Sequence, residues 1–427
     1  MLSYKKLQGK EGYIMKLIEL TEAQYKELYQ KFPEANFMQM YEWGQVMQQT
    51  RKQTPIYIGL IDDTNTCIAG ALLLKKKLFL QMSYFYSPRG FLIDFTDTEL
   101  VATFTKHLKT YMKQQHAIYL KVDPEIIYHD IDHKGQPIKD GHHNYDIYQS
   151  LLDLGYHHKG FNVLFEHNQP RYTFRRYFSK YHSISEMEKS LSKSFLSTVK
   201  RSYKYKQEVV EGMDPSLFYE LAQETAKKDN FTTFSKQFYA TFFKQFHTIK
   251  KAKIFNVVIY PDEILETRKK EINELKNKME KQQLSRKAAS DAPDVIKRME
   301  KDIRTFAPYE NQYPDGYVVA SLMCSYSKQG MYTLYLGNND LALYTFSINR
   351  LYYEVMIDCY NRGIAFMDLF GTIGDPQKQY QNLADLHEYK RKFGDQYTEF
   401  IGEFDLIYKP FWYRILPHLL KIYRKFH

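Results

Sequence analysis

Strand-like and helix-like hydrophobic patterns alternate along the first half of the chain. Short runs of consecutive or alternating apolar residues predict strands, and apolar residues spaced three or four positions apart predict helices. The predicted strands are 56–63, 69–78, 84–94, 118–124 and 169–178. The predicted helices are 97–115 and 145–154, and an exposed loop rich in Gly, Pro, His and Asp is expected at 125–144. This alternation indicates a mixed α/β (α+β) fold.

The second half of the chain repeats this rhythm. Helices are predicted at 185–206, 215–247 and 346–362, and a further helix ends in the sequence EYKRKF at 388–393. Strands are predicted at 253–260, 317–326, 332–339, 366–371 and 397–408. Two α/β units of similar size and order indicate a duplicated domain. We expect a first domain at 14–165 and a second domain that is divided between 166–259 and 309–427.

A segment of different composition, 260–308, interrupts the second unit. It is rich in Glu, Lys, Gln and Arg, and its apolar residues recur at heptad-like spacing on both sides of a break at 288–293. These residues are Leu265, Ile272, Leu275 and Met279 before the break, and Ile296, Met299, Ile303 and Phe306 after it. A narrow apolar seam on charged segments indicates an inserted antiparallel coiled-coil hairpin of two helices. The alternative is a poorly ordered charged insert.

Charge and cysteine content narrow the class of protein. The chain of 427 residues carries 60 Lys and Arg against 50 Asp and Glu, a net charge of +10. This charge suits a polyanionic partner, which is RNA, a nucleotide-linked substrate or an anionic membrane face. The three cysteines form no CxxC pair, so neither a disulfide framework nor a zinc ribbon is indicated. With no apolar signal-peptide core and no run of about 18 apolar residues, we expect a cytoplasmic protein.

The motifs of cofactor- and metal-dependent chemistry are absent from the sequence. His and Asp residues cluster at 129–143, but their spacing suits no closed tetrahedral ligand set. The sequence contains no GxSxG, no HExxH and no Walker GxxxxGK[ST] motif. We therefore expect neither a metal ion nor a cofactor.

Four segments with recognisable motifs span nearly the whole chain. They are YFYSPRGFLIDF at 84–95; YLKVDP at 119–124 with LLDLGYHHKGF at 151–161 and QPRYTF at 169–174; the charged hairpin; and HEYKRKFGDQYTEFIGEFDL at 387–406. In their order and spacing they resemble the Fem family of peptidoglycan cross-bridge aminoacyltransferases, the FemX, FemA, FemB and MurM type. This resemblance implies two tandem domains similar to the acetyltransferase (GNAT) fold, with the hairpin as an insertion.

The resemblance also implies an activity and partners. Family members move glycine, alanine or serine from an aminoacyl-tRNA to a stem- or bridge-peptide amine of a peptidoglycan precursor, which is lipid-linked or UDP-linked. The implied partners are therefore an aminoacyl-tRNA and this precursor, together with other Fem-family proteins and peripheral contact with the inner face of the membrane. The reaction needs no metal or cofactor, because the tRNA ester is already activated.

The family's aromatic-Lys motif is matched by Tyr389 and Lys390, and the resemblance makes these two the expected catalytic residues. Since an amine attacks an ester carbonyl, a fixed lysine charge can stabilise the developing oxyanion. Asp123 and Asp368 lie at the ends of predicted strands and are candidates to accept the proton of the amine, although carboxylates at strand ends more often cap the next loop.

The family pattern for precursor binding is matched only in part. Met47 and Phe234 stand where members commonly have a lysine and an arginine, so two expected cations are missing. Lys236, one turn from Phe234, is a substitute cation. The expected substrate-binding residues are Gln39, Trp43, Arg89, Tyr335 and Lys236.

Clustered cations are expected to bind the tRNA backbone, because phosphate recognition needs charge and no sequence code. The predicted basic helix at 189–206 is the favoured site, since the hairpin mixes its cations with many Glu residues. The expected tRNA-binding residues are Lys200, Arg201, Lys204 and Arg391.

The sequence also allows other functions to be considered. A CoA-dependent N-acyltransferase would carry a Q/R-x-x-G-x-G/A pyrophosphate loop, which does not occur in the sequence. A catalytically impaired member that acts as a substrate-binding or scaffold protein in cell-wall synthesis is favoured by Met47 and Phe234. The basic amphipathic stretch 411–426 is expected to pack against the body, with contact to an anionic membrane face as the alternative.

Overall fold

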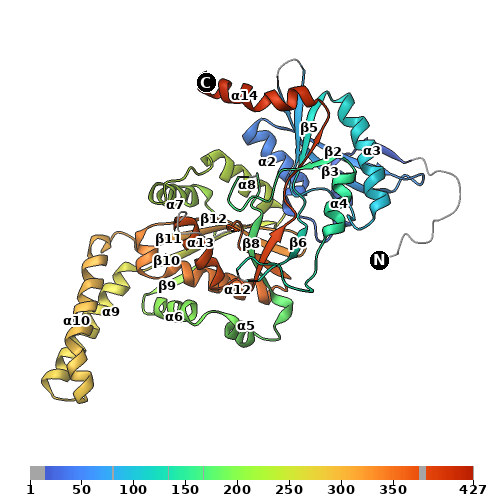
Figure 1. Ribbon diagram of the computed structural model, residues 1–427. Helices are drawn as coiled ribbons and strands as arrows, with labels where there is room; N and C mark the ends of the chain where they lie inside the picture. Colours follow the sequence, from blue (N-terminus) through green and yellow to red (C-terminus); the bar gives the residue numbers. More distant parts are fainter. Residues whose placement is uncertain (1–14, 79–80, 133, 167, 375–380, 427) are drawn as a thin grey trace.

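The computed structural model contains two β-sheets with helices packed on them, and a helical hairpin projects away from the second sheet (Figure 1). It describes residues 15–426 except 79–80, 133, 167 and 375–380. The prediction of a mixed α/β fold with an inserted hairpin is confirmed.

The first sheet has seven strands in the order β1-β2-β3-β4-β5-β15-β7. They are β1 (Lys16–Glu19), β2 (Thr54–Ile61), β3 (Cys67–Lys77), β4 (Ser83–Ser87), β5 (Ala117–Val122), β15 (Phe404–Ile407) and β7 (Tyr156–His158). Its helices are α1 (Glu22–Gln30), α2 (Tyr41–Arg51), α3 (Thr98–Gln114) and α4 (Tyr145–Asp153). Only the β4–β5 pair among these strands is parallel, and α3 is the crossover that such a pair requires.

The second sheet has eight strands in the order β6-β14-β8-β13-β12-β11-β10-β9. They are β6 (Ile127–Asp130), β14 (Gln396–Phe400), β8 (Tyr172–Tyr177), β13 (Phe366–Asp368), β12 (Gly330–Asn338), β11 (Tyr317–Tyr326), β10 (Ala252–Ile259) and β9 (Gln207–Gly212). Its helices are α5 (Ile184–Ser190), α6 (Lys193–Ser202), α7 (Pro215–Lys228), α8 (Lys236–Thr248), α11 (Asp340–Tyr344), α12 (Ser347–Asn361) and α13 (Gln381–Arg391).

The two halves of the chain exchange strands. β15 comes from the C-terminal part of the chain but lies between β5 and β7 of the first sheet. β6 comes from the N-terminal half but pairs with β14 in the second sheet. The domain ranges stay a prediction. Two strands do not follow them, because β15 lies in the range of the second domain but in the first sheet, and β6 lies in the range of the first domain but in the second sheet.

The single strand predicted at 397–408 was wrong, because this segment forms two strands in two different sheets. The break falls at Gly402, which has a φ of +97°. This backbone conformation suits glycine, and a Cβ there would lie 2.8 Å from the His158 ring. The chain therefore leaves β14 at Phe400 and enters the first sheet at Phe404.

Other predicted elements also differ from the structure, and the strand predicted at 84–94 ends as β4 at Ser87. The helix at 185–206 is two helices, because the Ser192 hydroxyl accepts a bond from the Phe195 N–H and starts a new one, α6. The helix at 215–247 divides in the same way at the N-cap Ser235 of α8. The loop expected at 125–144 contains strand β6, whose residues pair with β14.

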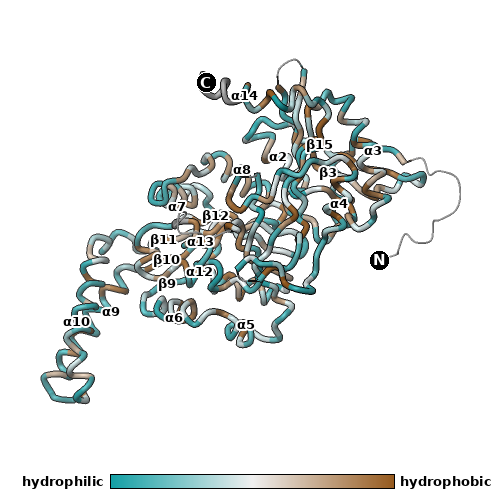
Figure 2. The backbone as a smooth tube through the Cα atoms, in the orientation of Figure 1, coloured by the Kyte–Doolittle hydropathy of each residue, from teal (hydrophilic) through white to brown (hydrophobic). Residues whose placement is uncertain are grey.

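The hairpin consists of α9 (Pro261–Glu280) and α10 (Arg286–Phe306), which pack on each other. Its turn lies at 281–285, so the break predicted at 288–293 was wrong, and α10 continues through Pro293. Hydrophilic residues make up most of the hairpin, with shorter apolar stretches between them (Figure 2). At its base, Ile264, Leu265 and Phe306 belong to the core of the second sheet, which fixes the hairpin to the body.

A shared aromatic core joins the two sheets. Phe37 and Trp43 from the N-terminal region pack edge-on against Phe242, and Phe37 also contacts the Tyr332 ring of β12 at 5.2 Å. All four rings are buried. Because one apolar core contains residues from both halves, the junction is a fixed part of the fold.

The chain ends in α14 (Pro410–Phe426), which lies across one end of the first sheet (Figure 1). Leu416 is buried against Met82 and Ile118, so part of this helix packs on the body as predicted. Among the described helices, none is long and apolar enough to cross a membrane.

Replacement of Phe404 tests the role of β15 in the first sheet. The Phe404 side chain is 0% exposed, so Phe404→Ala should lower the free energy of unfolding by about 3–5 kcal/mol through cavity formation. Urea denaturation measures this change. The matched variant Phe231→Ala, at a ring that is 52% exposed, should stay within about 0.5 kcal/mol of wild type. Equal stability of the two variants would contradict the assignment of β15.

Candidate active site between the two sheets

A buried arginine connects the two halves of the chain at the junction of the sheets. Arg175 on β8 forms one ion pair with Glu125, which follows β5, and another with Asp368 at the end of β13. The Arg175 Nε donates to Asp368 Oδ2 at 2.8 Å. Arg175 is buried, so its charge requires both carboxylates as partners.

The Asp368 carboxylate is fully engaged. Besides Arg175, the Thr173 hydroxyl donates to its Oδ1 at 2.6 Å, and the Phe370 N–H donates to the same oxygen at 2.7 Å. These three donors hold the Asp368 carboxylate in a fixed position at the cavity.

Glu125 collects donors from three parts of the chain. In addition to Arg175, the Asn36 amide donates to it, and the Tyr332 hydroxyl lies at 3.4 Å from its carboxylate oxygens. Asn36 precedes the short 3₁₀ helix η2 (Phe37–Gln39), and Tyr332 is on β12. The carboxylate thus ties the N-terminal region to the second sheet.

These groups surround a small cavity. Its volume is about 10 Å³, which is close to the room that a single water molecule needs. The polar lining is Asn36, Arg89, Glu125, Thr173, Tyr332 and Asp368, and the apolar part is Met38, Pro170, Phe370, Gly371 and Phe400. Its wall consists of strand residues of the second sheet together with residues of η2 and of the segments that follow β4 and β5 of the first sheet.

Lys390 lies directly behind this wall. Its Nζ donates to the carbonyl oxygens of Phe370 at 2.8 Å and Gly371 at 2.7 Å, two residues that line the cavity. The Lys390 residue is only 9% exposed. Burial lowers the pKa of this ammonium to about 8, while the Asp368 carboxylate acts in the opposite direction. The lysine is therefore a buried, mostly protonated charge next to the cavity at neutral pH.

The other predicted catalytic residue, Tyr389, lies elsewhere. Its ring packs against Phe393 at 5.2 Å and Tyr352 at 6.2 Å in the core of the second sheet. It does not line the cavity, although it neighbours Lys390 on α13. His387, also on α13, is buried beside Thr372, and burial lowers the pKa of the His387 imidazole. The catalytic roles of Tyr389 and Lys390 stay predictions.

Asp123 and Arg89 are coupled at the cavity's first-sheet side. The Tyr86 hydroxyl and the Arg89 N–H each donate to the Asp123 carboxylate at 2.7 Å. Burial raises the pKa of Asp123 to about 6, and the Arg89 charge opposes this shift. The Arg89 guanidinium donates to the Pro170 carbonyl at 2.7 Å and lies over the Phe400 ring. Of the predicted substrate residues, Arg89 is the one that lines the cavity.

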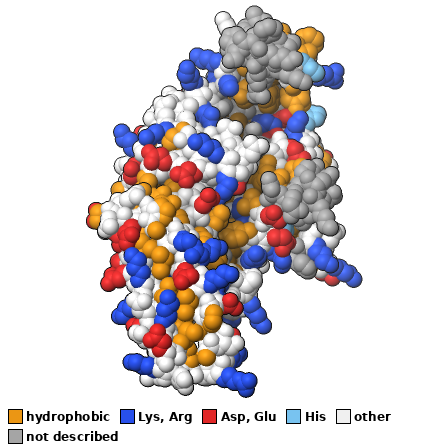
Figure 3. Space-filling model, turned by 90° about the vertical axis from the view of Figure 1, so that its left-hand side faces the viewer, with side chains coloured by type: hydrophobic (Ala, Val, Ile, Leu, Met, Phe, Trp, Pro, Cys, Tyr) orange, Lys and Arg blue, Asp and Glu red, His pale blue; other side chains and the backbone are white. Residues whose placement is uncertain are grey.

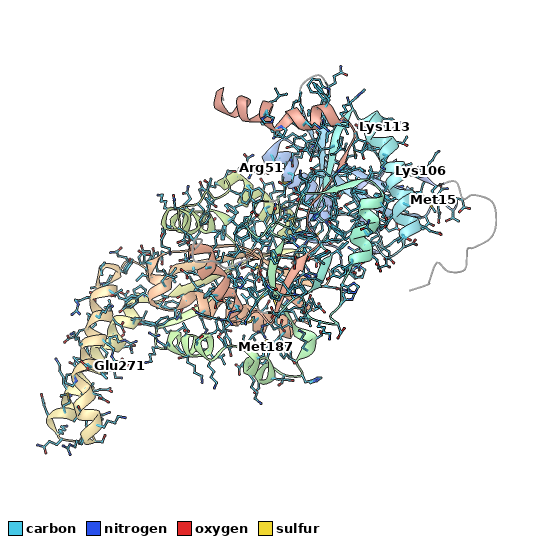
Figure 4. All side chains as sticks on the ribbon, in the orientation of Figure 1. Met15, Arg51, Lys106, Lys113, Met187 and Glu271 are labelled. Carbon is cyan, nitrogen blue, oxygen red and sulfur yellow. The ribbon has the colours of Figure 1, made fainter. Side chains whose placement is uncertain are left out.

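Two more of the predicted substrate residues, Trp43 of α2 and Tyr335 of β12, lie on either side of Phe238 of α8. The Trp43 ring contacts Phe238, which in turn contacts Tyr335 at 6.2 Å. Arg51, labelled in Figure 4, lies 4.9 Å from the exposed ring of Phe234. A first-domain cation that the sequence analysis missed is therefore found beside Phe234, where the family pattern has an arginine.

Two other predicted substrate residues have different surroundings. Gln39 is fully buried, and its side-chain amide donates to the Pro88 carbonyl at 2.7 Å and accepts from the Leu72 N–H at 3.0 Å. These bonds orient the η2 segment next to Asn36. Lys236 is exposed at the first turn of α8. The substrate roles of both residues stay predictions.

The predicted tRNA-binding residues of α6 lie near the base of the hairpin. Lys200 is exposed near the end of α6, and Arg201 stacks on Phe346 at 4.1 Å. Lys204 lines a groove of about 450 Å³ whose other basic residues are Lys206, Arg268 and Arg350. Arg391 is outside this groove and forms an exposed ion pair with Glu388. On the hairpin, basic and acidic side chains are intermixed (Figure 3).

Arg175 and Glu125 are site residues that the sequence did not predict. The available signal was the strand QPRYTFRRYF, which carries Arg171, Arg175 and Arg176 between aromatic residues. All three are buried, and charged residues in a buried strand require partners. Among the described residues, no three His, Cys, Asp or Glu side chains are grouped so as to hold a metal ion.

Replacement of Arg175 tests the buried ion network. Arg175→Met leaves Glu125 and Asp368 buried without their partner, so the free energy of unfolding should fall by about 3–5 kcal/mol in urea denaturation. The matched variant Arg391→Met breaks an exposed ion pair and should cost less than about 1 kcal/mol. A loss below about 1 kcal/mol for Arg175→Met would show that this network does not hold the junction together.

Comparisons with known proteins agree with this architecture. A model of the FemAB family matches residues 20–421. The chain is 24% identical over 423 residues to a Staphylococcus aureus protein named lipid II:glycine glycyltransferase, with 95% of this chain and 96% of that protein covered. The crystal structure of FemX superposes with a TM-score of 0.74 and 23% identity, over 94% of this chain and 99% of that chain. The chain belongs to the FemAB family.

Proposed function

We propose that this protein is an aminoacyltransferase of peptidoglycan cross-bridge synthesis. In this reaction it transfers a small amino acid from an aminoacyl-tRNA to a peptide amine of a peptidoglycan precursor. The observation that carries the proposal is the buried Lys390 ammonium behind the wall of the cavity between the sheets. Membership of the FemAB family over nearly the whole chain supports it.

The chemistry asked of the site is attack of an amine on an ester carbonyl. A C–N bond forms, the ester C–O bond breaks, the amine loses one proton and the departing tRNA hydroxyl gains one. The ester already supplies the free energy, so the protein has to position the two substrates and stabilise the oxyanion of the tetrahedral intermediate.

Lys390 is suited to stabilise this oxyanion. Its ammonium is buried and held by two carbonyl oxygens, so its position is fixed before the substrate arrives. A charge in a water-poor site stabilises a developing anion more strongly than the same charge in water. Asp123, whose pKa burial raises to about 6, is the better placed of the two aspartates to take the proton, because Asp368 is engaged by Arg175.

Substrate binding must widen the cavity. Its present volume of about 10 Å³ admits no aminoacyl group. Entry of the ester therefore requires wall side chains to move apart, among them the Arg89 guanidinium, which donates to the Pro170 carbonyl and lies over the Phe400 ring. The ester then reaches the Phe370 and Gly371 carbonyls that hold Lys390.

The names of the relatives suggest the substrates. Because the Staphylococcus aureus relatives are named lipid II:glycine glycyltransferases, we take a lipid-linked precursor as the acceptor and glycine as the first donor to test, ahead of alanine and serine. The protein would then work inside the cell, at the inner face of the membrane.

The groove at the base of the hairpin supports a tRNA donor. Lys204, Lys206 and Arg350 line it, and the Arg350 guanidinium lies over the ring of the exposed Tyr203 at 3.6 Å. Lys200 and Arg201 extend the positive charge along α6. Such a cluster binds phosphates without reading sequence, as a tRNA backbone requires.

Transfer of labelled amino acid tests the proposal directly. Wild-type protein should move label from glycyl-tRNA to a lipid-linked precursor, with alanyl- and seryl-tRNA compared in parallel. Lys390→Ala should reduce the rate by about 10²–10³, the loss typical of one oxyanion-stabilising group. Lys392→Ala, two positions along and exposed, should retain the wild-type rate.

Failure of this experiment would be informative. If no donor transfers to either a lipid-linked or a UDP-linked acceptor, the enzyme proposal falls. If transfer occurs at the same rate in Lys390→Ala, the class of enzyme stands and the role of Lys390 does not.

The pH dependence of transfer tests the charge on Lys390. The wild-type lysine loses its proton as the pH rises through about 8, whereas an arginine at this position stays charged. The rate of Lys390→Arg divided by that of wild type should therefore be constant below pH 7 and increase between about pH 7 and 9. Taking this ratio removes the titration of the acceptor amine. A ratio that stays constant across the whole range would contradict the proposed role.

A further inference from the structure

We propose that α14 and the neighbouring end of β3 form a surface that binds an anionic lipid bilayer. Its described residues are Lys76, Lys77, Leu78, Phe411, Trp412, Arg414 and Leu419, and it is called the α14 surface below. The inference rests on the proposed function, since a lipid-linked acceptor is what would bring this protein to a membrane.

The two parts of the α14 surface are joined by direct packing. Leu416 of α14 is buried against Met82, which precedes β4, and Ile118 of β5. Leu78 at the end of β3 and Trp412 of α14 pack against this same small cluster. The exposed side chains around it therefore belong to one continuous surface at the end of the first sheet.

Apolar side chains of α14 face solvent. Phe411 is 67% exposed, the highest value among the large hydrophobic residues of the described chain, and Leu419 is 37% exposed. Only Leu416 of the described α14 side chains is buried in the body. Trp412 and Tyr413 pack partly against the same cluster, whereas exposed apolar residues such as Phe411 and Leu419 suit insertion into the headgroup region of a bilayer.

Positive charge surrounds these apolar side chains. Lys76, Lys77 and Arg414 are exposed, and Lys113 on α3 is exposed at the same end of the molecule (Figure 4). Burial and the nearby Lys77 charge both lower the pKa of Lys75, as expected where cations are crowded. Basic residues next to an apolar surface match the negative charge of anionic lipids.

Acidic residues are absent from the chain after Asp405. Residues 406–427 contain five Lys and Arg and no Asp or Glu. Asp405 itself is buried and pairs with Lys121 at 3.0 Å, so it does not offset the charge of the α14 surface. In Figure 3, hydrophobic and basic side chains lie side by side at the top of the molecule, the end where α14 is found in Figure 1.

The position of the α14 surface agrees with a lipid-linked acceptor. β15 leads directly into α14 and runs antiparallel to β5, so α14 begins at the Ile118 end of β5. Glu125 and the cavity lie beyond the opposite end of β5, about 20 Å away at 3.3 Å per residue. A membrane at the α14 surface would thus hold the lipid near one end of the first sheet and the reactive headgroup toward the other.

Vesicle co-sedimentation tests this inference without any transfer reaction. The wild-type chain should bind vesicles of phosphatidylcholine mixed with phosphatidylglycerol, and bind more weakly to phosphatidylcholine alone or in high salt. Phe411→Ser/Arg414→Glu should bind the anionic vesicles at least about tenfold more weakly. The matched control Phe231→Ser/Lys278→Glu changes an exposed phenylalanine and an exposed lysine elsewhere, and should bind like wild type.

Three outcomes would overturn the inference: no vesicle binding by wild type, equal losses in both double variants, or a loss that appears only for a labelled tRNA and not for vesicles. A separate transfer assay distinguishes this result from failure of the proposed function. Phe411→Ser/Arg414→Glu should keep the wild-type rate on a UDP-linked, water-soluble acceptor, and lose rate on the lipid-linked acceptor in vesicles.

Discussion

The ion pairs of Arg175 determine how the two halves of this molecule meet. One buried guanidinium binds Glu125 from the end of the first sheet and Asp368 from the second, and both carboxylates line the cavity. A charge in this position is tolerated only with partners of fixed geometry. The shape of the cavity and the electrostatic surroundings of Lys390 therefore both depend on Arg175.

The exchange of strands places this network where it is. β15 follows the strands of the second sheet in the sequence but belongs to the first sheet, whereas β6 comes between strands of the first sheet in the sequence but belongs to the second. Between them lies the shared aromatic core around Phe37 and Trp43. Because each half supplies a strand to the other, the cavity wall is assembled from segments far apart in sequence. Lys390 can thus be buried next to the junction while the hairpin and α14 extend to the surface.

Much of the fold follows from sequence patterns, and the site follows only in part. Apolar runs located most strands to within a few residues, and the heptad seam identified the hairpin. The break at Gly402 was missed because a continuous apolar run does not reveal which sheet receives each part. Lys390 was found through a motif, whereas Arg175 and Glu125 were not, since ion pairing across 50 positions leaves no local pattern. Gln39 matched a motif, and the structure shows its amide bonded within the first domain.

If Lys390 stabilises the tetrahedral oxyanion, the most direct measurement is the dissociation constant of a phosphonate analogue of that intermediate, attached to the 3′ end of a tRNA acceptor stem. Lys390→Met should weaken binding of the phosphonate by about 100-fold, while binding of an uncharged amide analogue of the donor is unchanged. Equal weakening of both analogues, or of neither, would contradict this role of Lys390.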